Sequence, residues 1–275
     1  MGRRFPAGAL AVLAVAAALV PSCAAPTVKR AMWLWQKADP AAVVEWAAAQ
    51  KVGEIFAYVP PEPTAGERTR LTELKRNADA AGIALAALGG TPEWTFDHAA
   101  ALAWQRTAMG TGLFRAAHVD VEPYHLPAWK TDRAKTVASF TSLLAELRDA
   151  DPRPLEADVP FWYQTVPSGG RTLADDVLAR VDAVTVMSYR DTATGPGSIM
   201  DISADMLRRG ERAGRPVRLG AETLDLPDCP HCSFHGKDRE ALATALDQVD
   251  EAAAAYPAYA GIAVHDYAAW TALRP

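Results

Sequence analysis

Short runs rich in β-branched residues alternate with longer, alanine-rich amphipathic segments from about residue 30 to the last residue. This alternation predicts an α/β protein whose strands lie parallel in one sheet. Eight strand-like runs fall at residues 31–35, 53–59, 83–88, 116–121, 155–159, 183–189, 217–222 and 261–265. Helix-like segments follow them at residues 41–50, 66–80, 98–109, 132–149, 173–179, 203–212, 238–256 and 268–273. Eight strand–helix pairs in this length favour a single (β/α)8 barrel, a TIM barrel, over an open doubly wound sheet.

The connections between these segments are unequal in length. The longer ones follow strands, at residues 60–64, 167–170, 194–197 and 224–237. The joins from a helix back to the next strand are short, as at residues 81–82. Since barrel enzymes build their sites from the loops that follow strands, we expect the working face at the carboxyl ends of the strands.

The alternation of apolar and polar residues predicts which side chains face the barrel axis. In the fourth strand Val119 and Val121 would pack against helices, so that Asp120 and Glu122 face inward. The same reasoning on the other strands directs inward Trp33, Trp35, Asp158, Met187, Tyr189, Arg218, Gly220, Glu222 and His265. Lower in the barrel we expect an internal ion-pair layer, not a catalytic group, from Glu54, Glu156 and Arg218.

The predicted mouth is acidic and aromatic, which is typical of sites that act on glycosides. Carboxyl groups supply proton transfer and stabilise an oxocarbenium-like transition state, while aromatic faces stack on sugar rings. The predicted catalytic residues are Glu122, which protonates the glycosidic oxygen, Glu222, the nucleophile or charge stabiliser, and Asp120. Asp120 would oppose loss of the Glu122 proton by like-charge repulsion. The predicted substrate-binding residues are Trp35, Tyr58, Asp158, Tyr189, Arg190 and His265. No cofactor and no metal are expected.

Two motifs in this set resemble glycoside hydrolase family 18, the chitinases and their relatives. They are Asp120-Val121-Glu122-Pro123-Tyr124 and Val186-Met187-Ser188-Tyr189. The resemblance implies a TIM barrel in which Glu122 is the general acid, Asp120 orients the acetamido group of the substrate and Tyr189 supports it. His118 stands where this family has a further aspartate, and Arg190 replaces the aspartate that usually follows the tyrosine.

A second resemblance is to the clan of retaining barrel glycosidases. That clan has its acid/base glutamate at the end of strand four and its nucleophilic glutamate at the end of strand seven, the positions of Glu122 and Glu222. Val121 stands where the clan usually has an asparagine. A carboxyl separation of about 5 to 5.5 Å would predict retention of configuration, and about 6.5 to 9.5 Å inversion.

Two other functions remain open at this stage. The departures at His118, Val121 and Arg190 are compatible with a barrel that binds carbohydrate without cleaving it. A metal-dependent hydrolase could use His118, Asp120, Glu122 and His265, although the first strand reads Trp33-Leu34-Trp35 and lacks the His-x-His of typical amidohydrolase barrels.

The N-terminal segment changes the expected location of the protein. Arg3 and Arg4 precede an apolar run at residues 7–20, which predicts a cleaved signal peptide over residues 1–25 ahead of a single barrel domain at residues 26–275. Val20-Pro21-Ser22-Cys23 also resembles a bacterial lipobox, so Cys23 is a candidate for lipidation and membrane attachment. We therefore expect an exported bacterial protein, either secreted or held at the cell surface.

Charge and cysteine content add two further expectations. The net charge of −5 and the scattered basic residues argue against nucleic acid as a partner, and we expect a monomer that binds carbohydrate. Cys229 and Cys232 in an exported protein favour a local disulfide over a metal knuckle or a thioredoxin-like redox site.

Overall fold

The computed structural model describes residues 1–2 and 30–275. Apart from Met1 and Gly2, the predicted signal peptide lies outside the described residues, and so does Cys23. Among the described helices, none is long and apolar enough to cross a bilayer.

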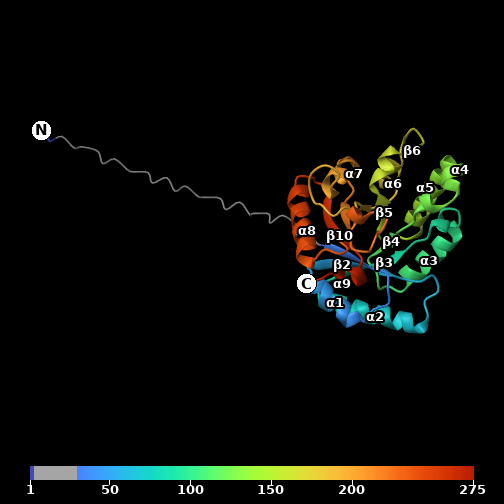
Figure 1. Cartoon of the computed structure of the whole chain (residues 1–275), viewed down its shortest axis with the longest axis horizontal. Helices are drawn as coiled ribbons and strands as arrows, with labels where there is room; N and C mark the ends of the chain where they lie inside the picture. The colour runs from blue at the N-terminus through green and yellow to red at the C-terminus, as the bar shows by residue number, and fades with distance from the viewer. Residues whose placement is uncertain (3–29) are drawn as a thin grey trace.

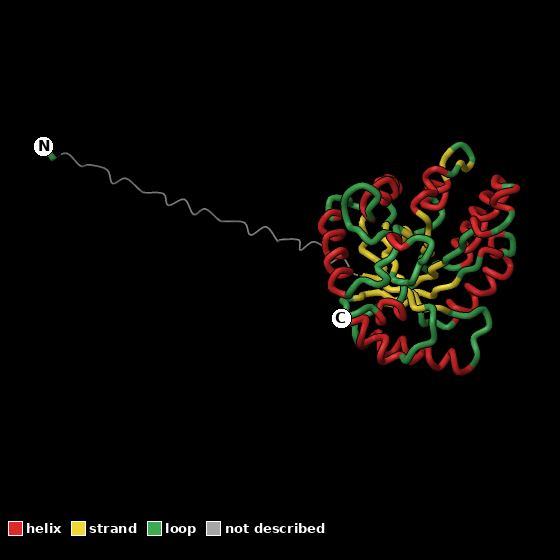
Figure 2. The backbone as a smooth tube through the Cα atoms, viewed as in Figure 1, coloured by secondary structure: helices red, strands yellow, loops and turns green. Residues whose placement is uncertain are grey.

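Eight parallel strands close into a barrel, as the sequence predicted, with helices arranged around it (Figures 1 and 2). The order of neighbours around the barrel is β1-β10-β9-β8-β5-β4-β3-β2, with β1 also paired to β2. The bounds are β1 Arg30–Leu34, β2 Val52–Tyr58, β3 Ala84–Gly89, β4 Ala116–Val119, β5 Leu155–Pro160, β8 Ala183–Met187, β9 Val217–Glu222 and β10 Tyr259–His265. A short antiparallel pair outside the barrel, β6 Pro167–Ser168 and β7 Arg171–Thr172, was not predicted.

The helices are α1 Pro40–Ala49, α2 Ala65–Ala80, α3 His98–Gly110, α4 Ala128–Thr131, α5 Arg133–Ala150, α6 Leu173–Leu178, α7 Ile199–Ala213, α8 Arg239–Ala253 and α9 Tyr267–Ala272. Four 3-10 helices complete the elements of residues 30–275: η1 Pro92–Thr95, η2 Pro123–His125, η3 Phe161–Thr165 and η4 Pro230–Cys232. Side-chain caps start α1 and α5 within one residue of their predicted starts, because Asp39 accepts a hydrogen bond from the Ala42 amide and Asp132 from the Lys135 amide. Helix α7 begins four residues earlier than predicted, at Ile199, because Ser198 caps it through the Asp201 amide.

Two apolar clusters show that the strand alternation was interpreted correctly. The larger cluster lies between barrel and helices and includes Val119, Val121, Leu219 and Val264. The smaller one contains Ala31, Trp33, Phe56, Ala86, Leu88, Ala116 and Ala263, with Trp35 and Tyr58 packed against it. The inward positions therefore form a second core inside the barrel, and the polar inward residues lie above and below it.

The predicted ion-pair layer is present inside the barrel. Arg218 contacts Glu54 and lies 3.2 Å from Glu156, and Arg115 bridges the same two carboxylates, at 2.6 Å from Glu156. Both glutamate side chains are at most 6% exposed. Two guanidinium groups thus face two carboxylates at this level.

Candidate active site

Strand β4 ends at Val119, two residues before the predicted end, and the two acids follow it. The Asp120 amide still donates to the Gly89 carbonyl at 3.0 Å, so the chain remains paired to β3 for one more residue. A Cβ atom at Gly90 would lie 1.9 Å from the Asp120 carbonyl oxygen, so only glycine permits this close approach. Glu122 then caps η2, which Pro123 begins.

Glu122 is more accessible than Asp158 and Glu222, with 26% of its side chain exposed against 1% and 4%. The Tyr124 hydroxyl donates to Oε1, and His125 Nε2 lies 3.4 Å from Oε2. Burial and the Glu122 charge raise the pKa of Tyr124, so its phenol keeps its proton and remains a donor. Tyr124 therefore fixes the orientation of Glu122 while leaving it open to the solvent.

Asp120 lies deeper, and its Oδ1 atom is buried without a hydrogen-bond partner in the described part of the chain. Burial, together with the charges of Asp158 and Glu122, raises the pKa of Asp120 well above its usual range, and His118 only partly opposes this. The sequence assigned the retained proton to Glu122. In the structure burial also favours the protonated form of Asp120, because ionisation is more costly away from solvent.

Glu222 is held on all sides at the end of β9. Its Oε1 accepts from the amides of Thr223 and Leu224 at 2.7 and 2.8 Å, and His265 Nδ1 lies 3.1 and 3.0 Å from Oε1 and Oε2. Only 4% of the Glu222 side chain is exposed. This carboxylate is therefore a fixed anion, not a freely accessible group.

His265 connects Glu222 to the predicted sugar-binding residue Trp35. The Trp35 indole N–H donates to His265 Nε2 at 3.0 Å, and because an indole can only donate, Nδ1 must carry the imidazole hydrogen. Burial lowers the pKa of His265, but the carboxylates of Glu222, Asp266 and Asp158 more than offset this and raise it. The Trp35 donor opposes that rise, so protonation of the ring requires this bond to break.

Tyr189 lies among the acids that the alternation predicted to converge. Burial raises its pKa well above the usual range, and so do the charges of Glu222, Asp158, Asp120 and Glu122. Its ring occupies space beside Gly220, where an added Cβ would lie 3.1 Å from the ring carbon Cε1. Carboxyl groups from three different strand ends are thus close enough to one phenol to influence it.

The other predicted binding residues lie around this group. The rings of Trp35 and Tyr58 are 5.6 Å apart, and Tyr58 is half-buried. Arg190 faces sideways: its Nη1 donates to the Tyr189 carbonyl at 2.6 Å and lies 3.4 Å from Cys232 Sγ, while its guanidinium is 5.3 Å from the Phe161 ring centre. Arg190 therefore connects the mouth to the loop at residues 224–237.

Sequence reasoning missed an aromatic cluster beside Glu122. Tyr124 packs against Trp162 at 5.2 Å, Trp129 at 6.4 Å and Tyr163 at 6.5 Å between ring centres. Burial and the charges of Glu122 and Asp120 raise the pKa of Tyr163. The sequence feature that could have indicated this cluster is the tyrosine directly after Glu122-Pro123, because a residue so close in sequence to Glu122 lies near it in space.

Cys229 and Cys232 form a disulfide, which confirms the preferred interpretation of this pair. With His231 they are the one group of three or more His, Cys, Asp or Glu residues, among those that the structure describes, whose ligand atoms all lie within 4.8 Å of one another. Because the two sulfur atoms are bonded to each other, they present no thiolate to a metal. His118, a ligand in the metal-hydrolase alternative, uses both ring nitrogens on Glu156 and Asp158.

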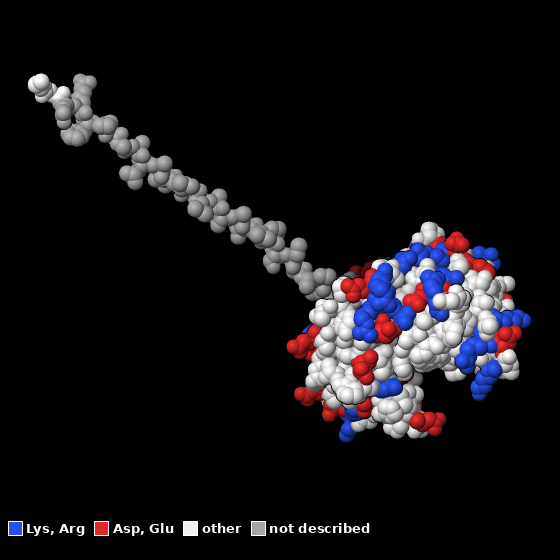
Figure 3. All heavy atoms as spheres, turned by 90° about the horizontal axis from the view of Figure 1, so that it is seen from above, with Lys and Arg blue, Asp and Glu red and all other residues white. Residues whose placement is uncertain are grey.

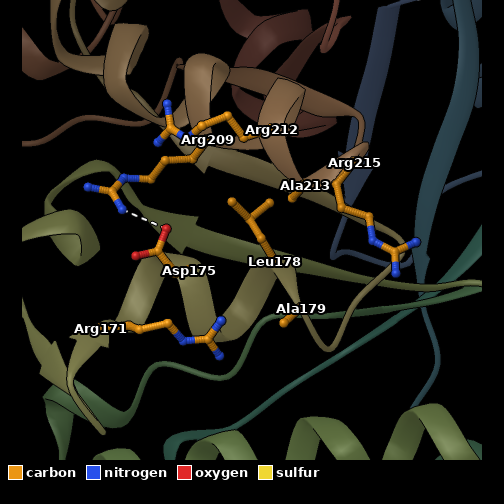
Figure 4. A pocket seen from close by; sticks show the side chains of 8 residues that line it. All are labelled: Arg171, Asp175, Leu178, Ala179, Arg209, Arg212, Ala213 and Arg215. Carbon is orange, nitrogen blue, oxygen red and sulfur yellow. Dashed lines mark hydrogen bonds and ion pairs between the residues drawn. The ribbon is translucent and has the colours of Figure 1, made fainter.

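A separate cavity of about 420 Å³ lies between α6 and α7 (Figure 4). Its lining includes Arg171, Arg209, Arg212, Arg215 and Asp175. Except for Arg212, these arginines form ion pairs with Asp175, Asp176, Asp182 and Asp205. The face drawn in Figure 3 likewise shows basic side chains interspersed with acidic ones. Since most of this charge is neutralised within the protein, the barrel mouth remains the candidate site.

Comparison with known proteins identifies the fold. No protein-family model matches the sequence, and no curated protein does. Among solved structures, a GH18 chitinase from Pseudoalteromonas aurantia matches with a TM-score of 0.56 and 14% identity, over 87% of this chain and 94% of that one. A chitinase from Chromobacterium violaceum matches with a TM-score of 0.55 and 14% identity, over 90% and 98%. The spore cortex-lytic enzyme SleL of Bacillus cereus gives 0.54 and 11%, over 86% and 70%. The chain is therefore a TIM barrel that resembles the GH18 chitinases in fold.

Proposed function

We propose that this protein is a glycoside hydrolase that cleaves an oligo- or polysaccharide, with Glu122 as its general acid. The observation that carries this proposal is the pairing at one barrel mouth of a partly exposed carboxyl group, Glu122, with Asp120, whose Oδ1 is buried and whose pKa is raised. Such a pair supplies a proton at a solvent-accessible position near neutral pH. The fold shared with chitinases supports the same class of reaction.

In the proposed reaction Glu122 donates a proton to the glycosidic oxygen while the bond between that oxygen and the anomeric carbon breaks. A water molecule then forms the new bond to the anomeric carbon, and its proton returns to the carboxyl groups of Glu122 and Asp120. Asp120 holds a proton next to Glu122 and can replace the one that Glu122 loses. Tyr124 keeps the Glu122 carboxyl group aimed at the leaving oxygen. Proton donation of this kind contributes about 10²- to 10⁴-fold to a rate.

Glu222 serves in this proposal as a charge stabiliser, not as the nucleophile. Two backbone amides hold its Oε1, His265 contacts both oxygens, and only 4% of the side chain is exposed, so Glu222 is poorly placed to approach the anomeric carbon. A fixed anion in a dry site stabilises positive charge on the sugar ring without reorganisation. The alternative role of Glu222 as nucleophile predicts a covalent glycosyl-enzyme that mass spectrometry would detect after trapping with a fluorinated sugar.

Aromatic side chains give the substrate a wall on which to lie. Trp162 is half-buried beside Tyr124, and Trp35 packs against Tyr58 on the opposite part of the strand order. The faces of such rings stack on the C–H surfaces of sugars and bind them with little loss of entropy. We therefore propose that the glycan passes between the Trp162 side and the Trp35 side of the mouth.

Replacement of Glu122 tests the proposal. Glu122→Gln keeps the shape of the side chain but carries no transferable acid proton, so we expect turnover to fall by about 10³-fold or more with an unchanged melting temperature. Purified protein would first be screened against bacterial, fungal and plant glycans for release of reducing ends. The matched control is Glu62→Gln, an exposed glutamate in the loop after β2, which should leave turnover unchanged. Full activity of Glu122→Gln on the cleaved glycan would refute the assignment.

A barrel that binds carbohydrate without cleaving it is distinguished by the same screen. It would bind an oligosaccharide in calorimetry but release no reducing ends, and Glu122→Gln would bind equally well. Arg190, which replaces the family's aspartate and contacts Cys232, is the observation that favours this alternative.

We also propose that the protein is exported, with or without lipid attachment at Cys23. The apolar run at residues 7–20 and the disulfide of Cys229 and Cys232 support this, because disulfides persist in oxidising compartments. Mass spectrometry of the mature protein would distinguish a lipidated Cys23 at the N-terminus from a cleaved and released chain. An uncleaved N-terminus would contradict export through this leader.

A further inference from the structure

His118 occupies the centre of the barrel with no exposed surface. Its ring stacks on Phe56 with 3.8 Å between ring centres and meets the edge of Trp33 at 6.3 Å. No step of the proposed reaction uses this residue. Histidine is rarely placed in a dry core without a specific partner, so its contacts need an explanation.

Both ring nitrogens of His118 face carboxylates. Nε2 lies 2.8 Å from Asp158 Oδ1, and Nδ1 lies 3.2 Å from Glu156 Oε2. An ionised carboxylate only accepts hydrogen bonds, so satisfying both contacts requires a hydrogen on each nitrogen, which is the imidazolium form. Burial lowers the pKa of His118, but Asp158 and Glu156 more than compensate and raise it to about 9.

Asp158 is fixed by two donors of different kinds. His118 donates to Oδ1, and the Trp33 indole N–H donates to Oδ2 at 2.9 Å. The Asp158 side chain is 1% exposed, so it has no water to turn towards. The resulting anion next to Asp120 is one of the charges that raise the pKa of Asp120.

We propose that His118 is a positioning residue whose imidazolium fixes Asp158 beside Asp120 and keeps the acids of the mouth from holding the proton used at Glu122 too tightly. This inference rests on the proposed role of Glu122 as the acid. It also connects the two polar levels of the barrel, because the same imidazolium contacts Glu156 of the ion-pair layer. The charged and titratable groups around it are Glu156 and Asp158 from β5, Asp120 beyond β4, Arg115 and Arg218 with Glu54 through Glu156, and His265 across Trp33.

The two donors to Asp158 provide a matched pair of variants. His118→Asn removes the positive charge, whereas Trp33→Phe removes a neutral hydrogen bond to the same carboxylate. For His118→Asn we expect kcat to fall by about 10- to 100-fold with little change in KM, and both limbs of the pH profile to move to higher pH. The acidic and basic limbs of the pH–rate profile move because, without the positive charge of His118, the remaining carboxyl groups hold their protons more tightly. For Trp33→Phe we expect a loss below about tenfold, with both limbs in place.

A purely structural His118 would give a different result. Its loss would lower the melting temperature and kcat together and leave the limbs of the pH profile where they are in the wild-type protein. That outcome overturns the proposal, and so does an equal shift of the limbs in Trp33→Phe.

NMR of the intact wild-type protein tests the charge of His118 without any substrate or variant of the site. In a sample with ¹⁵N-labelled histidine, we expect one of the six imidazoles to be protonated on both nitrogens at pH 7.5 and to titrate near pH 9. Substitution of the other five histidines one at a time assigns that signal to His118. A neutral His118 ring at pH 7.5 would overturn the inference even if Glu122→Gln is inactive. An active Glu122→Gln would instead overturn the proposed function and leave the imidazolium observable.

Discussion

Two polar levels of the barrel interior differ in how many cationic groups accompany their carboxyl groups. In the lower level, the carboxylates of Glu54 and Glu156 are matched by Arg115 and Arg218. At the mouth, the four carboxyl groups of Asp120, Glu122, Asp158 and Glu222 have ion-pair partners only in His118, His125 and His265 among the described residues. Where guanidinium groups match the carboxylates in number, the carboxylates stay ionised. Where carboxyl groups outnumber the cations, like-charge repulsion raises the pKa of some of them. We therefore expect the lower level to support the fold, and the proposed chemistry belongs to the upper level.

The largest expected effect comes from unbalancing the lower level. Arg218→Met leaves Glu54 and Glu156 with Arg115 as their only guanidinium partner, so we expect the free energy of unfolding to fall by about 3–5 kcal/mol. Urea denaturation measures this change. Arg212→Met is the control, because Arg212 has no ion-pair partner among the described residues and should change stability by about 0.5 kcal/mol or less. Equal effects of the two substitutions would show that the lower level does not support the fold.

Removing a carboxyl group from the mouth should lower turnover without lowering the free energy of unfolding. Asp120→Asn eliminates a buried acid among like charges, so we expect stability to be kept or increased while turnover falls by about 10²- to 10³-fold. Thermal unfolding and initial rates on the same glycan measure the two effects. Asp225→Asn, at an exposed position after β9, is the matched control. Loss of stability without loss of turnover would reverse the comparison.

The link between the levels predicts a pH dependence of stability. The folded-state pKa of His118 is about 9, above its ordinary value of 6.5, so the folded protein binds the extra proton more tightly. Its contribution is therefore complete below pH 6.5 and is lost as the pH rises from 6.5 through 9, by about 3 kcal/mol at most. Denaturation at several pH values should give a flatter curve for His118→Asn than for wild type. His98→Asn, which removes a partly exposed histidine paired with Glu146, serves as the control. Parallel curves for wild type and His118→Asn would contradict this assignment.

The close approach of β3 to the mouth can be tested with two glycines. At Gly90 an alanine methyl group would collide with the Asp120 backbone, so Gly90→Ala should lower stability by about 1–3 kcal/mol and also reduce turnover. At Gly66 in α2 nothing lies within 4 Å of the added atom, so Gly66→Ala should be neutral or raise stability slightly. Denaturation and rate measurements on both variants compare them directly. A fully active Gly90→Ala would mean that the position of Asp120 does not matter.

The smallest expected effect concerns the disulfide beside the mouth. The double replacement Cys229→Ser and Cys232→Ser opens a very short loop, so we expect stability to fall by about 2 kcal/mol or less. Turnover should change little, because Glu222 remains bonded to the Thr223 and Leu224 amides. Assays with and without reductant on the wild-type protein provide the check. A large loss of turnover would extend the upper level to include this loop.

The barrel and its inward residues could be predicted from the sequence because they depend on a local pattern. The buried pairs Val119 and Val121, or Ile262 and Val264, define a face of each strand by alternation alone. The partners across the barrel could not be predicted, since they depend on the register of closure. The bond from Trp33 to Asp158 joins β1 to β5, and the proton on Asp120 depends on how deeply the closed barrel buries it.

Two local features were misjudged because short-range signals outweigh the strand pattern. Pro123 starts a 3-10 helix, so β4 ends at Val119 although the polar and apolar alternation continues to Glu122. Gly169 and Gly170 both have positive φ angles and turn β6 back onto β7, where the sequence had indicated only a loop.

The hydrogen bond from Trp35 to His265 fixes which nitrogen of the His265 ring carries its hydrogen. The Trp35 indole N–H can only donate a hydrogen bond. His265 Nε2 therefore cannot take up a proton while it accepts that bond, so protonation of the ring requires the bond to break. Protonation of His265 at lower pH therefore separates Trp35 from the histidine that contacts Glu222. In this way a single donor-only contact couples the position of the Trp35 ring to the protonation of His265.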